Sequence, residues 1–187
     1  PWQARGMPKS GQVYDPRVLE RSALLEDFRV VARSLLGSSD WPTLERFTAV
    51  VEEERRQRAP DQMPVRFVPA ARQRRRAVRA PLELAELYDG RIALDGDIPC
   101  LESSYHDLFN ALVWAAFPRS KRALHRRQFQ ALQASLPPGV ERLPNRRTRE
   151  RDALALLDEG GSLLLALADA PVERTRVMLF GHALMDH

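Results

Sequence analysis

The segment at residues 103–121, SSYHDLFNALVWAAFPRSK, constrains the fold of this chain more than any other part of the sequence. Ser103 or Ser104 can cap a helix, Pro118 can end it, and the residues between them are apolar on nearly every side of a helical projection. A helix that is apolar all round is normally buried all round. The sequence therefore predicts a buried helix over residues 104–117.

The head of this predicted helix carries three hydrogen-bonding side chains, His106, Asp107 and Asn110. At about 100° per residue they share one arc of the helix, and a buried polar group without a partner costs about 1–3 kcal/mol. The positive end of a helix favours ionised Asp107 and neutral His106, which suits a metal ligand or a general base that Asn110 orients. Alternatively, the three side chains are internal clamps that only satisfy the backbone.

A second polar group lies in RDALALLDEGGSLLLAL, residues 151–167, which predicts a β-hairpin with its turn at 158–161. In a strand, Asp152 and Asp158 point to the same face, and with Glu159 at the turn they suit Mg²⁺ or Mn²⁺. The alternatives are ordinary turn chemistry for the residues at 158–161 and a structural ion pair between Asp152 and a neighbouring arginine.

His182 follows Gly181 in TRVMLFGHALM, which predicts a strand broken at the glycine or a strand that leads into a helix. This histidine is either a core residue or a ligand. If the hairpin packs over the head of the 104–117 helix, both polar groups converge on one divalent-metal site that activates water. The predicted metal ligands are His106, Asp107, Asp152, Asp158 and His182, and the predicted catalytic residues are His106, Asp107, Asn110 and Asp152.

Basic residues near these groups predict an anionic substrate. Lys121 is either a surface lysine or one that reaches back to an acid. The net charge is +4, and the arginine-rich runs at 72–79 and 142–151 could contact the phosphates of a nucleic acid. We do not favour that partner, because acids are interspersed through most of the chain and such runs are typical of solvated loops. The predicted anion-binding residues are Lys121, Arg149 and Arg151.

The 187 residues predict one domain over residues 1–187, with an irregular arm at 1–14. Helices are expected from Asp15 to Gly37, after Ser39 or Asp40, at 82–88 and from Ser120 to about residue 135. An edge strand is expected at 63–70, and turns at 89–99. The predicted class is α+β, with mostly helical N-terminal two-thirds packed with a small C-terminal antiparallel sheet or hairpin.

The cysteine content and the length of the apolar runs indicate where in the cell the protein is expected. The single cysteine, Cys100, excludes an intrachain disulfide and fits a reducing cytoplasm. The longest apolar run, at about 111–117, is too short to span a bilayer, so no membrane partner is expected.

Seven segments of the chain together resemble one family. They are YDGRI, GDIP, YHDLFNALVW, FPRSK, RDA, DEGG and FGHAL, and the pattern resembles the bacterial proteins grouped as domain of unknown function 3025. The resemblance covers roughly residues 40–187. Cys100 stands where the family pattern has threonine, and His125 where it has asparagine. Because the family has no assigned function, the resemblance narrows the fold more than the chemistry. The segments occupy residues 88–92, 96–99, 105–114, 117–121, 151–153, 158–161 and 180–184.

These observations favour a divalent-metal-dependent hydrolase, using Mg²⁺, Mn²⁺ or Zn²⁺, that acts on an anionic substrate such as a phosphoester. Two alternatives remain open. One is a non-catalytic scaffold or partner-binding protein, in which the polar groups are internal clamps. The other is a nucleic-acid-binding module that uses the arginine-rich runs.

Overall fold

The computed structural model describes residues 13–70, 83–137, 143, 146–165 and 176–186. Within these residues the chain is predominantly helical, with six α-helices, several short 3₁₀ or π-helical turns and two separate pairs of strands. The predicted arm at 1–14 lies almost wholly outside the described residues, as does the basic run at 72–79. None of the helices in the described segments combines the length and the apolar composition that crossing a membrane requires.

The predicted helix between Asp15 and Gly37 is divided into three elements. Two 3₁₀ helices, η2 (Val18–Arg21) and η3 (Ala23–Phe28), lead into the short helix α1 (Arg29–Ala32). Ser22 interrupts them, because its extended backbone, with φ −148° and ψ 140°, lies outside the helical region. The segment nevertheless buries its apolar face, at residues Val18, Leu19, Leu25, Phe28, Val31 and Leu35.

Helix α2 (Leu44–Arg58) is amphipathic and packs against both helix α4 (Tyr105–Ala116) and strand β1 (Arg66–Pro69). Thr43 caps it in place of the predicted Ser39 or Asp40, because the Thr43 Oγ1 accepts a hydrogen bond from the Arg46 amide at 3.2 Å. The residues of its buried stripe are Leu44, Phe47, Val50 and Val51, as predicted.

Strands β1 (Arg66–Pro69) and β2 (Asp97–Cys100) form a parallel pair, in which Phe67 lies opposite Ile98. The strand predicted at 63–70 is confirmed. The turns predicted at 89–99 are wrong for most of their length, because residues 89–95 lie in short helical elements and residues 97–99 lie in β2. Both central side chains of the pair, Phe67 and Ile98, are buried.

Three short helical elements precede β2: η4 (Leu84–Glu86), α3 (Tyr88–Gly90) and the π-helical turn η5 (Arg91–Asp95). Gly96 ends η5 with a φ of 73°. A Cβ at this position would lie 2.3 Å from the Pro64 carbonyl oxygen, so glycine is required where β2 begins beside the chain that leads into β1.

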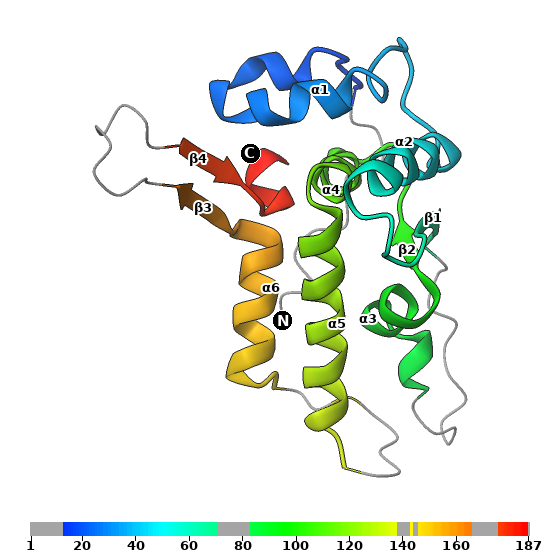
Figure 1. Ribbon diagram of the computed structural model, residues 1–187, viewed down its shortest axis with the longest axis vertical. Helices are drawn as coiled ribbons and strands as arrows, with labels where there is room; N and C mark the ends of the chain where they lie inside the picture. Colours follow the sequence, from blue (N-terminus) through cyan, green and yellow to red (C-terminus); the bar gives the residue numbers. More distant parts are fainter. Residues whose placement is uncertain (1–12, 71–82, 138–142, 144–145, 166–175, 187) are drawn as a thin grey trace.

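Helices α4 (Tyr105–Ala116) and α5 (Pro118–Ala134) follow one another with only Phe117 between them. Ser104 caps α4 by accepting a hydrogen bond from the Asp107 amide at 3.3 Å, and α4 is buried nearly all round, as predicted. Because α5 already starts at Pro118, Ser120 is not its cap. Helix α5 continues between α6 and α3, which lie on its two sides (Figure 1).

The last third of the chain corrects the predicted fold class. Residues 149–160 form a helix, α6 (Arg149–Gly160), and not the first strand and turn of a hairpin. Strand β3 (Ser162–Leu165) follows α6 and pairs with β4 (Arg176–Leu179), and the 3₁₀ helix η7 (His182–Asp186) comes last. Helices are therefore not confined to the first two-thirds, and the middle of the chain carries a parallel strand pair.

The composition of α6 explains the wrong hairpin prediction. The short apolar stretch ALALL resembles a strand, but alanine and leucine are the strongest helix formers, and alanine is depleted in strands. Thr148 caps the helix, since its Oγ1 accepts a hydrogen bond from the Arg151 amide. Asp158 and Glu159 consequently lie in the last helical turn, and Gly161 follows as the C-cap.

Candidate functional site

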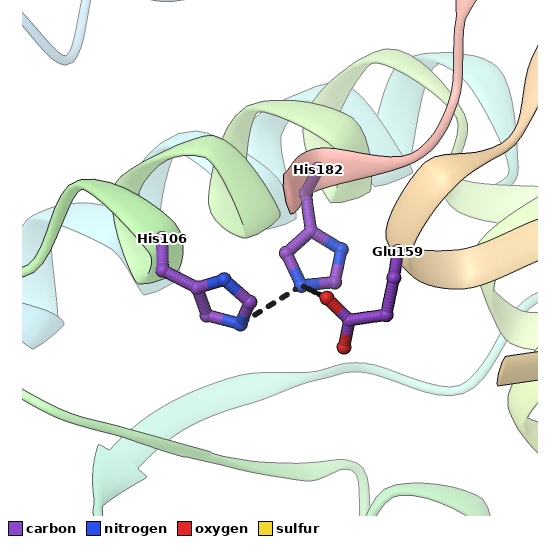
Figure 2. Close-up of side chains that lie close together, drawn as sticks. All are labelled: His106, Glu159 and His182. Atoms are coloured by element: carbon purple, nitrogen blue, oxygen red, sulfur yellow. Dashed lines mark hydrogen bonds and ion pairs between the residues drawn. The ribbon is translucent and has the colours of Figure 1, made fainter. Parts of the chain in front are cut away.

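Three side chains from three distant elements meet at one point. His106 is the second residue of α4, His182 is the first residue of η7, and Glu159 lies in the last turn of α6. The two Nε2 atoms are 3.1 Å apart, and the Glu159 Oε2 lies 3.8 Å from the His182 Nε2. Figure 2 shows the His182 ring between His106 and the Glu159 carboxylate. The ligand atoms of all three lie within 4.8 Å of one another.

Gly181 allows His182 to reach this point. A Cβ on Gly181 would lie 2.4–2.6 Å from backbone atoms of residues 159–161, at the end of α6. The Gly181 amide instead donates a hydrogen bond to the Gly161 carbonyl at 2.7 Å. The missing side chain therefore lets the chain after β4 touch the end of α6, which places His182 beside Glu159.

The His182 ring is held in one tautomer. Its Nδ1 lies 2.9 Å from the backbone carbonyl oxygen of Asp158, and since a carbonyl only accepts, Nδ1 carries the proton. Burial, reinforced by the positive charge of Lys121, lowers the pKa of His182 to about 3. The ring is neutral at pH 7, and its Nε2 presents a lone pair towards His106 and Glu159. A backbone carbonyl behind the ring is the usual support of a metal-binding histidine.

The spacing of these atoms suits a metal ion. Two imidazole nitrogens at about 2.0–2.1 Å from a tetrahedral Zn²⁺ lie about 3.3 Å apart, close to the 3.1 Å between His106 and His182. The Glu159 side chain is 46% exposed, so a change of its rotamer can bring Oε2 to the same ion. Without a metal, the same geometry is a hydrogen bond between two histidines.

Lys121 and Asp158 form a buried ion pair beneath this cluster. The Lys121 Nζ lies 2.5 Å from the Asp158 Oδ1, and the two side chains are 0% and 9% exposed. Burial alone would raise the pKa of the Asp158 carboxyl, but the charge of Lys121 holds it at about 2. Lys121 is therefore not a surface lysine, and it reaches an acid, which was the other prediction for this residue.

His125 lies one turn further along α5 and is fully buried. Its ring is stacked on Trp114, with centroids 5.4 Å apart and planes 1° apart. The Gln128 amide lies near the ring, yet neither the ring nitrogens nor the Gln128 Oε1 has a hydrogen-bond partner among the described residues. Burial, then the charge of Lys121, lowers the pKa of His125 to about 3, so this ring is also neutral.

These residues belong to two polar stripes that face each other. Antiparallel packing of α5 against α6 brings the stripes together, with Lys121 paired to Asp158 near one end. Residues at spacings of three and four lie on one side of a helix. The stripe of α5 comprises Lys121, His125 and Gln128, and that of α6 comprises Asp158 and Arg151, with the small Ala155 between them.

A cleft of about 110 Å³ opens between α3, α5 and α6. Arg147 and Arg151 line it at the start of α6, and Asp158 and Glu159 line it at the end. Glu159 therefore belongs both to the cleft and to the histidine cluster. The complete lining is Tyr88, Asp89, Gln128, Arg147, Arg151, Ala155, Asp158 and Glu159.

The structure brings together only part of the predicted convergent site. His106 and His182 meet, and Asp158 supports His182 through its backbone carbonyl rather than its carboxylate. Asp152 is exposed on α6 and lies outside the cluster, because in a helix it does not share a face with Asp158. Arg151 lines the cleft, whereas the exposed Arg149 does not.

Asp107 and Asn110 are buried on α4 but do not belong to the histidine cluster. The Asp107 Oδ2 accepts a hydrogen bond from the Leu101 amide at 3.0 Å, so the carboxyl clamps the loop between β2 and α4. Burial raises the pKa of Asp107, contrary to the low value that a helix N-terminus alone favours. The Asn110 Oδ1 has no hydrogen-bond partner within the described part of the chain.

Several site residues were missed from the sequence. Glu159 was considered only as an oxygen ligand at a turn, and its meeting with the two histidines requires the helical form of α6. The stripe formed by Lys121, His125 and Gln128 was visible as helical spacing within a predicted helix. Arg147 belongs to the arginine-rich run at 142–151, which was considered only for the phosphates of a nucleic acid, and nothing local in the sequence indicates that Tyr88 lines the cleft.

The comparisons with known proteins identify the family. The model of a family described as protein of unknown function, DUF3025, matches residues 75–175, which is more than half of the chain. The chain therefore belongs to the DUF3025 family, and the resemblance noted in the sequence is confirmed. No curated protein and no solved structure matches the chain significantly.

Proposed function

We propose that this protein is a divalent-metal-dependent hydrolase of an anionic substrate, with His106, His182 and Glu159 as metal ligands. One observation carries the proposal: two imidazole nitrogens 3.1 Å apart lie beside a carboxylate that also lines a cleft. Two histidines and a glutamate form a common ligand set of catalytic zinc sites, whereas Mg²⁺ prefers oxygen ligands. Among the divalent metals, this ligand set favours Zn²⁺.

The chemistry follows from the number of ligands. Three protein ligands leave one position of a tetrahedral ion for water, whose pKa such an ion lowers to about 7. Because Glu159 borders the cleft, a substrate bound there would lie beside a metal held by this residue. The water oxygen would bond to the phosphorus or acyl carbon, the bond to the leaving oxygen would break, and that oxygen would take up the proton. The supporting carbonyl of Asp158 would keep His182 oriented throughout.

We also propose a small-molecule substrate and a cytoplasmic location. The arginines of the cleft are accompanied by Asp89 and Glu159, and mixed charge of this kind suits a small polar ligand better than a nucleic acid backbone. Cys100 is buried and unpaired, which fits a reducing compartment.

Metal titration of the purified, untagged protein tests the proposal. After chelation and desalting, calorimetry with Zn²⁺, Mn²⁺ and Mg²⁺ should show one Zn²⁺ per chain, and Zn²⁺ should raise the melting temperature by mass action. His106→Ala and Glu159→Gln should each weaken Zn²⁺ binding at least tenfold, since ligand loss removes a coordination bond.

Glu150→Gln is the matched control for Glu159→Gln. Both glutamates lie on α6, and their side chains are 44% and 46% exposed. The control should bind Zn²⁺ like the wild type. Absence of stoichiometric metal in the wild type, or equal binding by the wild type and His106→Ala, would rule out the hydrolase and leave the two histidines as an internal hydrogen bond of a non-catalytic protein.

A further inference from the structure

We infer that the cleft between α3, α5 and α6 binds the phosphate group of a phosphomonoester, and that it does so only after the metal is bound. The inference rests on the proposed metal site and adds the substrate class, the residues that hold the phosphate and the order of binding. Arg147, Arg151 and Gln128 are the residues that hold it.

Both arginines are available to a ligand. Arg147 and Arg151 line the cleft, and neither guanidinium forms an ion pair or a hydrogen bond with another described residue. Asp89 lies across the cleft and interacts with the two arginine charges only at longer range. Burial raises the pKa of the Asp89 carboxyl, although both arginine charges act to lower it. Arginine is the side chain best suited to a phosphate, because its planar donors engage two oxygens at once.

Gln128 supplies a second, independent sign of a ligand. Its side chain is 8% exposed and lines the cleft, yet its Oε1 has no hydrogen-bond partner among the described residues. A buried polar atom without a partner is costly, and the two ends of a glutamine amide are assigned only from their partners. With the amide turned round, its NH₂ group would occupy the position that now lacks a partner and would donate to a phosphate oxygen.

The charges of the cleft explain the order of binding. Without a metal, the two arginines and Lys121 balance the carboxylates of Asp89, Asp158 and Glu159, so a dianion gains little from entering. A divalent metal on Glu159 adds two positive charges at the end of the cleft opposite Arg147 and Arg151. The dianion then lies between the metal and the arginines, where the field is positive at both ends.

The size of the cleft fits a phosphate group rather than a large ligand. Its 110 Å³ greatly exceeds the roughly 10–15 Å³ that one water needs by the same measure. The alcohol part of the ester would remain outside. Hydrolysis would add the water oxygen to phosphorus, break the bond between phosphorus and the ester oxygen, and release the protonated alcohol.

Inorganic phosphate is the probe for the test. Protein loaded with one equivalent of Zn²⁺ and freed of excess metal by desalting is compared with chelated protein by calorimetry. The metal-loaded form should bind phosphate at least tenfold more tightly. Arg151→Gln should lose at least tenfold of that affinity. Arg147→Gln should lose as much, and because this side chain is exposed, the variant separates loss of the ligand from a folding defect.

Arg149→Gln is the control, because Arg149 lies on the same helix but outside the cleft. Equal phosphate affinity with and without metal, or an equal loss in Arg149→Gln and Arg151→Gln, would overturn the inference even if Zn²⁺ binds stoichiometrically. Absence of Zn²⁺ binding in the preceding titration would remove the proposed function and this inference with it, so the two failures are told apart.

Discussion

Helices α4 and α5 are consecutive and both largely buried, but α5 buries many more polar and charged side chains than α4 does. From Leu108 to Ala115, α4 buries apolar residues with the exception of Asn110. Helix α5 has a low apolar content and still buries a lysine, an arginine, a histidine and a glutamine, at Lys121, Arg122, His125 and Gln128. The apolar residues of the first helix account for its burial, whereas those of the second do not.

The buried polar residues of α5 fall into two groups. Arg122 and Lys121 are satisfied, because Arg122 donates hydrogen bonds to the carbonyls of Ile92 at 2.5 Å and Met63 at 3.1 Å, and Lys121 pairs with Asp158. His125 and Gln128 keep atoms without partners in the described structure. The comparison teaches that buried polarity by itself indicates internal clamps, whereas unsatisfied polarity beside a cleft indicates a ligand.

The largest effect on stability is expected when Lys121, one of the satisfied buried residues, loses its partner. Asp158→Asn leaves the buried Lys121 ammonium without a counter-charge, and breaking such a pair costs about 3–5 kcal/mol. The free energy of unfolding, measured with urea at pH 7, should fall by that amount. Glu150→Gln, on the same helix but in an exposed ion pair with Arg127, should lower it by no more than about 1 kcal/mol.

The double variant Lys121→Met with Asp158→Leu sharpens the comparison with α4. Replacing both partners by apolar residues should restore most of the stability. Leu112→Ala in α4 should lower stability by about 2–5 kcal/mol because of the cavity it leaves. Unlike the ion pair, this residue has no single partner whose replacement would restore the lost stability. If Asp158→Asn were no more harmful than Glu150→Gln, the ion pair would contribute nothing to holding α5 against α6.

The free energy of unfolding is expected to depend on pH through His125, one of the residues without hydrogen-bond partners. The pKa of His125 is about 3 in the folded protein against 6.5 ordinarily. Between these pH values the unfolded chain binds a proton that the folded chain does not, so stability falls as the pH falls. His125 alone should lower the free energy of unfolding by about 2 kcal/mol between pH 7.5 and 5. His125→Asn, which introduces the residue of the family pattern, should lack this loss.

Urea unfolding of the two proteins at both pH values gives the comparison directly. Lys121, Asp158 and Tyr88 face the His125 ring in both proteins. Asp107 and Glu159, whose raised carboxyl pKa values act in the opposite direction in more acidic solution, are also common to both. Their contributions therefore cancel in the difference. Parallel pH dependences would mean that His125 is not held neutral.

The same contrast explains what could be predicted from the sequence. Helix α4 was predicted because an apolar surface on every side needs no knowledge of its neighbours, and its cap Ser104 is local as well. Helix α6 was mistaken for a hairpin, because a short run of alanine and leucine satisfies both patterns until the cap at Thr148 and the packing on α5 decide.

The candidate site was predictable only where the chemistry is rare. His106 and His182 were selected as unusual residues in apolar surroundings, and they do meet. The burial of Lys121 and Gln128, by contrast, depends on the antiparallel packing of two helices, one of which was assigned wrongly. Tertiary packing, which no local pattern records, determines that part of the site.

The smallest effect is expected at Asp152, the predicted ligand that the structure leaves exposed in the first turn of α6. Asp152→Asn removes a negative charge that favours the helix N-terminus, so stability should fall by about 0.5 kcal/mol, and less at high salt. Zn²⁺ affinity should remain that of the wild type, because the ligand cluster does not include this residue. Loss of the metal in this variant would show that Asp152 and Asp158 act together in metal binding. The contrast between the buried Asp158 and the exposed Asp152 would then have no functional meaning.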